Sequence, residues 1–149
     1  METDKTNNFA KALSESGKQG RQIYETFCTT CHGPDGKGVK SGDKFLAPPL
    51  ANSEWFKHGG NAQMLARIVL KGQVGPVDGQ NYGEGLMLPL EQTYSDEQLA
   101  SVLNFIGQRW HGWKKPVVPD EITTVRKEIA ARKTPWTQEE LKALAKQKK

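Results

Sequence analysis

Cysteine is scarce in this sequence, and long apolar segments are absent from it. The 149 residues include only two cysteines, which do not supply the four ligands of a closed zinc site. The spacing of His58 and His111 does not complete such a site either. No apolar run approaches the roughly 18 residues of a membrane-spanning helix. We expect one soluble domain with a single hydrophobic core and an appendage.

The N-terminus shows no secretory leader, and the charge is unevenly distributed. The opening METDKTNNFA is polar and acidic rather than basic and then apolar. Residues 1–110 carry 11 Lys and Arg against 12 Asp and Glu, whereas residues 111–149 carry 10 against 5. The basic residues of this second part are interleaved with acids and lack a nucleic-acid-binding motif. We therefore expect a solvated helical surface there and no nucleic-acid partner.

Apolar spacing and capping residues predict a helical chain. Ser95 and Gln98 have the spacing of a capping box, and Thr137 and Glu140 repeat it near the C-terminus. The segments 33–52 and 73–94 are rich in glycine and proline, which indicates loops, and no strand alternation or internal repeat is visible. The expected helices cover residues 14–27, 62–72, 96–110, 120–133 and 134–149, with a short helical turn at 53–56.

Both cysteines belong to the segment FCTTCHGPDGKG, in which Cys28, Cys31 and His32 form C-x-x-C-H. A thioredoxin-like redox pair would follow a strand, whereas here a predicted helix leads into the motif. A disulfide across two residues would be strained and would close almost no loop. Covalent haem attachment explains every feature, because each thiol can bond one vinyl group and the next histidine can bind the iron. We interpret the motif as the attachment site of one haem c, with His32 as an iron ligand.

The sixth position on such an iron decides the function. A thioether closes the iron site and favours electron transfer, whereas an open site favours ligand binding or peroxide chemistry. Met87 lies in a glycine-rich loop before the helix at 96–110 and is the expected sixth ligand. Met64 falls on the apolar stripe of a predicted helix, where packing explains it. His58 and His111 are rival ligands that we expect to be solvated.

Residues 17–112 resemble a class I monohaem cytochrome c. The resemblance rests on four segments in the family's order, which are GRQIYETFCTTCHGPDGKG, APPLANSEW, RIVLKG and MLPLEQTYSDEQLASVLNFIGQRW. It implies an all-α class I fold, with three to four core helices around one covalently bound haem and a C-terminal helical extension. It also divides the chain into a flexible N-terminal segment at 1–13, a cytochrome c domain at 14–112 and an extension at 113–149.

The resemblance further implies roles for single residues. Met87 matches the family's sulfur ligand, although Leu88 separates it from Pro89, where the family has proline directly after the methionine. The carbonyl of Pro48, or otherwise of Pro49, would accept the Nδ1 proton of the haem histidine. The first and last helices of the domain would cross where Gly20 and Tyr24 meet Phe105. Further candidates for the haem edge and its propionates are Trp55, Arg67, Tyr82 and Trp110.

The implied function is one-electron transfer through a His/Met-ligated haem c. The protein would be an electron carrier, or a module of a larger redox enzyme, between a periplasmic dehydrogenase or respiratory complex and an oxidase or other acceptor. The alternative is a catalytic or sensory haem protein with a displaceable sixth ligand. The resemblance implies redox protein partners and a periplasmic location, with a leader lost by cleavage, by excision or with an upstream lipid anchor. Membrane association through a partner or such an anchor stays open.

Overall fold

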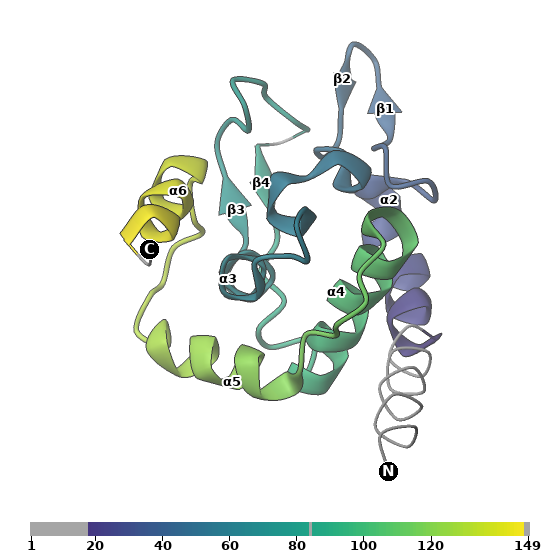
Figure 1. Cartoon of the computed structure of the whole chain (residues 1–149). Coiled ribbons are helices and arrows are strands. Elements are labelled where there is room, and N and C mark those ends of the chain that lie inside the picture. Colours follow the sequence, from purple (N-terminus) through teal and green to yellow (C-terminus); the bar gives the residue numbers. More distant parts are fainter. Residues whose placement is uncertain (1–17, 84, 148–149) are drawn as a thin grey trace.

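The structure is a computed structural model that describes residues 18–83 and 85–147, and most of its elements are helices (Figure 1). Residues 18–23 are α-helical and continue into η1, a π-helical turn. The predicted N-terminal segment at 1–13 and the first residues of the predicted helix, 14–17, lie outside the described residues. The elements in chain order are η1 Tyr24–Cys28, α2 Thr29–His32, β1 Lys40–Ser41, β2 Lys44–Phe45, η2 Leu50–Asn52, η3 Glu54–Phe56, α3 Ala62–Lys71, β3 Gln73–Val74, β4 Leu86–Met87, α4 Asp96–His111, α5 Pro119–Glu128 and α6 Gln138–Gln147.

The first helix crosses α4 at Gly20. A Cβ atom added there would overlap the Ser101 carbonyl oxygen and would lie 2.8 Å from the Cβ of Phe105. The Tyr24 ring packs beside Phe105, with 5.4 Å between ring centroids. The contact expected between Gly20, Tyr24 and Phe105 is thus present. It fixes the helix that leads into Cys28, because only a residue without a side chain lets the two backbones approach this closely.

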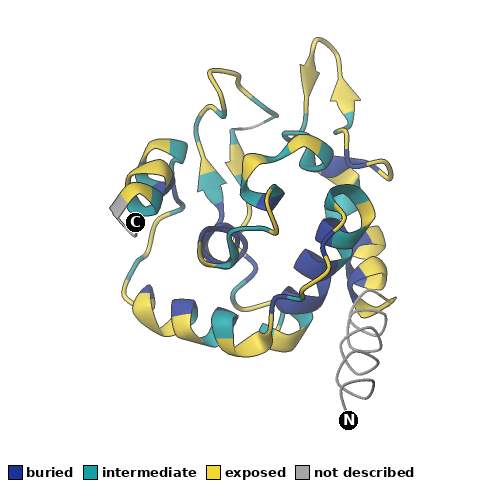
Figure 2. Ribbon diagram, in the orientation of Figure 1, coloured by how far each residue is buried: buried dark blue, intermediate teal, exposed yellow. Residues whose placement is uncertain are grey.

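Helix α3 is the central element of the core. Asn61 caps its first turn by accepting a 3.2 Å hydrogen bond from the Met64 amide, and Gly72 follows its last residue with a φ of 81°. All residues from Met64 to Lys71 are buried, so neighbouring elements cover nearly the whole circumference of the helix (Figure 2). A helix buried in this way needs partners on several sides.

The extension supplies part of that cover. Helix α5 packs against α3 and α4, and its buried residues lie on the side that faces α3 in Figure 2. The buried apolar residues of the extension belong to the same core cluster as those of α3 and α4 and are Trp113, Val117, Ile122, Val125, Ile129, Trp136 and Leu141. The extension therefore wraps the core, with its apolar side chains turned inward.

Within the described residues, the predicted helices agree with the structure except at the first, which continues through η1 and α2 to His32 rather than ending at 27, and at the junction of the last two. The capping boxes before α4 and α6 are both formed. Helix α5 ends at Glu128 rather than at 133, because Ile129 leaves helical geometry and is buried in the core, where the chain turns toward α6. Two antiparallel ribbons, β1–β2 and β3–β4, were not predicted, since strands of two residues are too short for an alternating pattern. Within residues 18–83 and 85–147, no helix has the length and hydrophobicity needed to cross a membrane.

Candidate functional site

The C-x-x-C-H motif forms the end of the first helix. Cys28 closes the π-helical turn, while Cys31 and His32 lie in α2, which ends at Gly33 with a φ of 80°. Cys28 is half-buried and Cys31 is exposed, and both thiols are free. Burial, and secondarily the nearby Cys31, raises the pKa of Cys28 to about 12, so this sulfur is a protonated thiol at neutral pH. Two unpaired sulfurs on successive turns are available for covalent attachment.

The imidazole of His32 is buried and oriented by a backbone carbonyl. Its Nδ1 lies 3.1 Å from the carbonyl oxygen of Pro48, while only 9% of the residue is exposed. Since a carbonyl can only accept, Nδ1 carries the proton and Nε2 keeps its lone pair. Burial lowers the pKa of His32, and the bond to Pro48 opposes this shift only in part. The result is a neutral imidazole with Nε2 as its donor atom, the form that ligates a metal.

The loop after the motif is tied back to the helix that precedes it. The amide of Gly38 donates to the His32 carbonyl at 2.8 Å, and the amide of Val39 donates to the Cys31 carbonyl at 3.1 Å. The buried Tyr24 hydroxyl donates to the Gly33 carbonyl at 2.5 Å. These bonds satisfy carbonyls that the end of α2 would otherwise leave open, and they hold the motif in one position.

Met87 lies on the second strand of the ribbon that follows α3. Strand β4 pairs antiparallel with β3, and Met87 is opposite Gln73. Its side chain is half-buried and packs against the hydrophobic core. A Cβ atom at Gly72 would overlap the Met87 carbonyl oxygen, so this glycine lets the chain after α3 pass directly beside the methionine.

The rival ligands have other contacts. Met64 is 1% exposed and packs in the core, as its place on the apolar stripe predicts. The Nε2 atom of His111 lies 2.8 Å from the Leu50 carbonyl oxygen, and its ring stacks on Phe56. The expectation that His111 is solvated is therefore wrong. His58 is exposed and has a φ of 59°.

The candidates for the haem edge lie in different surroundings. Tyr82 is half-buried and its hydroxyl donates to the Gln80 side chain at 3.2 Å, while Trp55 is half-buried against the core. Trp110 packs its ring 5.5 Å from Tyr24 and lies against Gly36, on the loop after the motif. These three predictions stay open.

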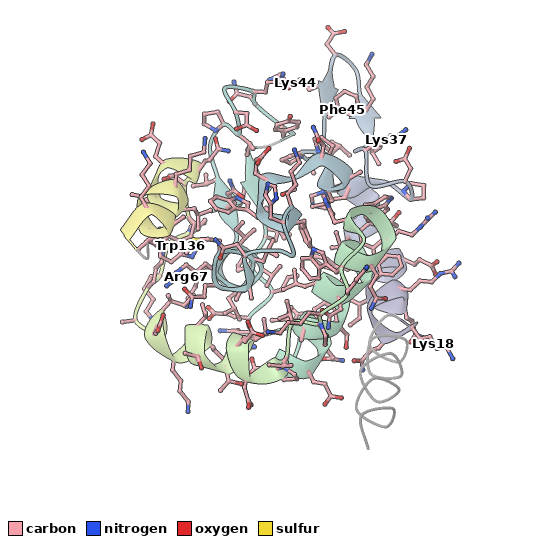
Figure 3. All side chains as sticks on the ribbon, in the orientation of Figure 1. Lys18, Lys37, Lys44, Phe45, Arg67 and Trp136 are labelled. Carbon is pink, nitrogen blue, oxygen red and sulfur yellow. The ribbon has the colours of Figure 1, made fainter. Side chains whose placement is uncertain are left out.

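Arg67 differs from these candidates because its side-chain partners, apart from the Gln63 carbonyl, belong to the extension. Its guanidinium is 3.2 Å from a Glu128 carboxylate oxygen. It also lies 5.9 Å from the ring centroid of Trp136, and Figure 3 labels these two side chains close together. Its side chain is 5% exposed, and its Nε has no hydrogen-bond partner among the described residues. These contacts assign Arg67 to the junction with the extension rather than to the predicted haem edge.

Sequence reasoning did not single out Trp136 as part of the site. Its backbone pairs with β3, the partner strand of the one that carries Met87. No periodicity or motif marks this pairing, since the two segments are far apart in the sequence.

The comparisons identify the family. A sequence model of the family described as Cytochrome c matches residues 17–110, which is more than half of the chain. The chain belongs to the cytochrome c family. Members of the cytochrome c family bind covalently attached haem c, transfer electrons and have redox proteins as partners. The prediction of an all-α class I cytochrome c fold is confirmed.

Two kinds of relative are similar to this cytochrome c. One cytochrome c-552 of Thermus thermophilus is 31% identical over 123 residues, which covers 76% of this chain and 78% of the relative. A second cytochrome c-552 of Thermus thermophilus is 31% identical over 116 residues, with 72% and 83% covered. A thiosulfate dehydrogenase of Stutzerimonas stutzeri is 44% identical over 41 residues, but this match spans only 13% of that protein and 28% of this chain.

The residues present fit haem c. The motif provides two free thiols and an oriented imidazole nitrogen, which is the donor set that this cofactor requires. Large apolar side chains are also exposed on β2, on β4 and just after it, at Phe45 (42%), Leu86 (46%) and Leu88 (59%). Phe45 is labelled in Figure 3, on the β1–β2 ribbon.

Proposed function

We propose that this protein carries single electrons through one haem c held by Cys28, Cys31, His32 and Met87. When bound, haem c supplies an iron that alternates between its ferrous and ferric states. The thioether bonds of the two cysteines would tie the cofactor to the helix end. His32 and Met87 would both bind the iron, which would leave no open position on it for a substrate.

The observation that carries the proposal is the contact between His32 and Pro48. It fixes the tautomer and the ring orientation, so that Nε2 is the nitrogen that would bind the iron. Met87 supports the same proposal, because it is a soft ligand on a strand that is paired and packed against the core. Both ligands come from supported backbone, which suits a carrier whose geometry changes little with oxidation state.

The partners we propose are periplasmic redox proteins that dock transiently over a small area. The periplasm is the compartment in which bacterial thioether attachment takes place, as the resemblance implies. The limited similarity to a thiosulfate dehydrogenase is compatible with use of this domain as a module of a redox enzyme as well as with a free carrier.

The optical spectrum of the mature protein tests the ligand set. We expect the oxidised protein to be low-spin, with a sulfur-to-iron band at the red edge of the spectrum. Met87→Ala removes the proposed ligand and should abolish this band and lower the reduction potential. Met64→Leu is the matched control, because Met64 is a core residue and its replacement should leave both properties unchanged.

Two results would contradict this proposal. A high-spin oxidised spectrum with rapid cyanide or peroxide binding would favour the catalytic or sensory alternative. A protein whose denatured mass equals that of the chain alone would exclude covalent attachment.

A further inference from the structure

The extension adds a third segment to the ribbon that carries Met87. The amide of Val74 donates to the Trp136 carbonyl at 2.8 Å, and the amide of Trp136 donates to the Gly72 carbonyl at 3.0 Å. These bonds make a parallel bridge between Gln73 and Trp136, and on its other edge Gln73 is the partner of Met87. Strand β3 is therefore held between the extension and β4, and Trp136 covers what would otherwise be its open edge.

Trp136 is firmly anchored, so the bridge has a fixed support. The residue is 7% exposed, and the guanidinium of Arg132 lies 3.5 Å from the centroid of its ring. Arg132 is itself bonded to the Thr134 and Pro135 carbonyls and to Glu140 of α6, each at 2.8 Å. The guanidinium of Arg67, on α3, lies 5.9 Å from the centroid of the same ring. Cation–π contacts of this kind are stronger where water is excluded.

A second set of hydrogen bonds joins the extension to the loop between β3 and β4. The Gln138 side chain accepts a 2.8 Å hydrogen bond from the Asp78 amide and donates a 3.0 Å bond to the Asp78 carboxylate. Asp78 has a φ of 50°, a conformation that a non-glycine residue rarely adopts without support. The extension thus holds both the base of the ribbon, through Trp136, and its connecting loop, through Gln138.

We propose that Trp136 and Gln138 are positioning residues for Met87. By holding β3 and its loop, they keep β4 in place and oppose withdrawal of the Met87 sulfur, so they slow the exchange of the sixth ligand. This inference rests on the proposed function, in which Met87 is that ligand. It gives the extension a role within this chain, which agrees with the inward direction of its apolar residues.

Cyanide binding to the oxidised holoprotein measures withdrawal of Met87, because cyanide binds only after the sulfur leaves. Because hydrogen bonds at an exposed site contribute little, Gln138→Ala, which removes both bonds to Asp78, should raise the binding rate about threefold. Trp136→Ala, which removes the anchor of the bridge, should raise it tenfold or more. The pH at which the sulfur-to-iron band disappears should fall in both variants, while the denatured mass stays that of the haem-bearing chain.

Matched controls separate positioning from general stability. Glu139→Ala changes an exposed residue of α6 next to Gln138 and should leave the cyanide rate unchanged. Val125→Ala weakens the packing of α5 in the core, outside the ribbon, and it should lower the thermal midpoint, as Trp136→Ala does, but raise the rate far less for the same loss of midpoint. Hydrogen exchange of the Val74 amide, the donor to Trp136, should be faster in Trp136→Ala than in Val125→Ala.

The outcomes distinguish this inference from the proposed function. If the unmodified protein lacks the sulfur band and binds cyanide rapidly, Met87 is not the ligand and the proposed function fails. If the unmodified protein has the band but Trp136→Ala and Val125→Ala bind cyanide equally fast, the positioning role is refuted and the proposed function stands. Unchanged cyanide-binding rates in both Gln138→Ala and Trp136→Ala would also refute the positioning role and leave the proposed function standing.

Discussion

The crossing of the first helix and α4 yields a prediction whose size follows from the structure. In Gly20→Ala the new Cβ would overlap the Ser101 carbonyl oxygen and lie 2.6 Å from the Ser101 carbonyl carbon, whereas ordinary contacts begin at 3.4 Å, so the two helices must separate by at least ~0.8 Å. Overpacking of this kind costs about 3 kcal/mol when the obstacle is backbone. The gain in helix propensity from glycine to alanine returns about 1 kcal/mol. The net loss is about 2 kcal/mol, which lowers the midpoint of thermal unfolding by roughly 4–8 °C.

Thermal unfolding of the holoprotein, followed by circular dichroism, measures this loss. Gln22 is an exposed residue of the same helix, so the difference between Gln22→Ala and Gln22→Gly gives the propensity contribution by itself. After that correction, Gly20→Ala should still be destabilised by the full cost of the overlap. A midpoint equal to that of the unmodified protein, or above it, would show that the close approach at Gly20 does not stabilise the fold.

Two further predictions concern the attachment of the extension. The buried Asn104 donates to the Val117 carbonyl at 3.0 Å and accepts from the Val117 amide at 2.7 Å, so Asn104→Ala should cost about 2–4 kcal/mol in urea unfolding. A loss below about 1 kcal/mol would contradict this. Burial raises the pKa of Asp96, but hydrogen bonds from Thr123 and Arg126 outweigh it and hold this pKa below its ordinary value. The stability that this lowered pKa contributes is present above the ordinary value near 4. It is lost as the pH falls through the folded-state value. Between pH 6 and pH 3, the urea midpoint of Asp96→Asn should therefore fall less than that of the unmodified protein.

Local chemistry made the fold and part of the site predictable. The motif around Cys28 and His32 places the proposed attachment and iron-binding side chains within five residues, and the capping box of Ser95 and Gln98 marks the start of α4 by side-chain bonds to adjacent backbone. The resemblance supplied the contact between His32 and Pro48, which no local pattern gives. Contacts between sequence neighbours, and contacts that the members of a family share, can therefore be predicted from the sequence.

The parts that were not predicted depend on contacts between distant segments. Arg67 has the same helical spacing whether it faces a cofactor or Glu128, and only the path of the extension decides between them. The pairing of Trp136 with β3 uses backbone atoms, which leave no trace in residue identity. His111 reads as a solvated residue at a helix end, yet packing against η2 and η3 brings it to the Leu50 carbonyl and the Phe56 ring.

The burial of α3 on nearly all sides has a consequence for truncation. Part of the cover over α3 comes from α5, so a chain that lacks residues 113–149 would expose apolar side chains of α3 to water. Such a chain would be prone to aggregation, and the truncation would therefore damage the core as well as any partner surface on the extension.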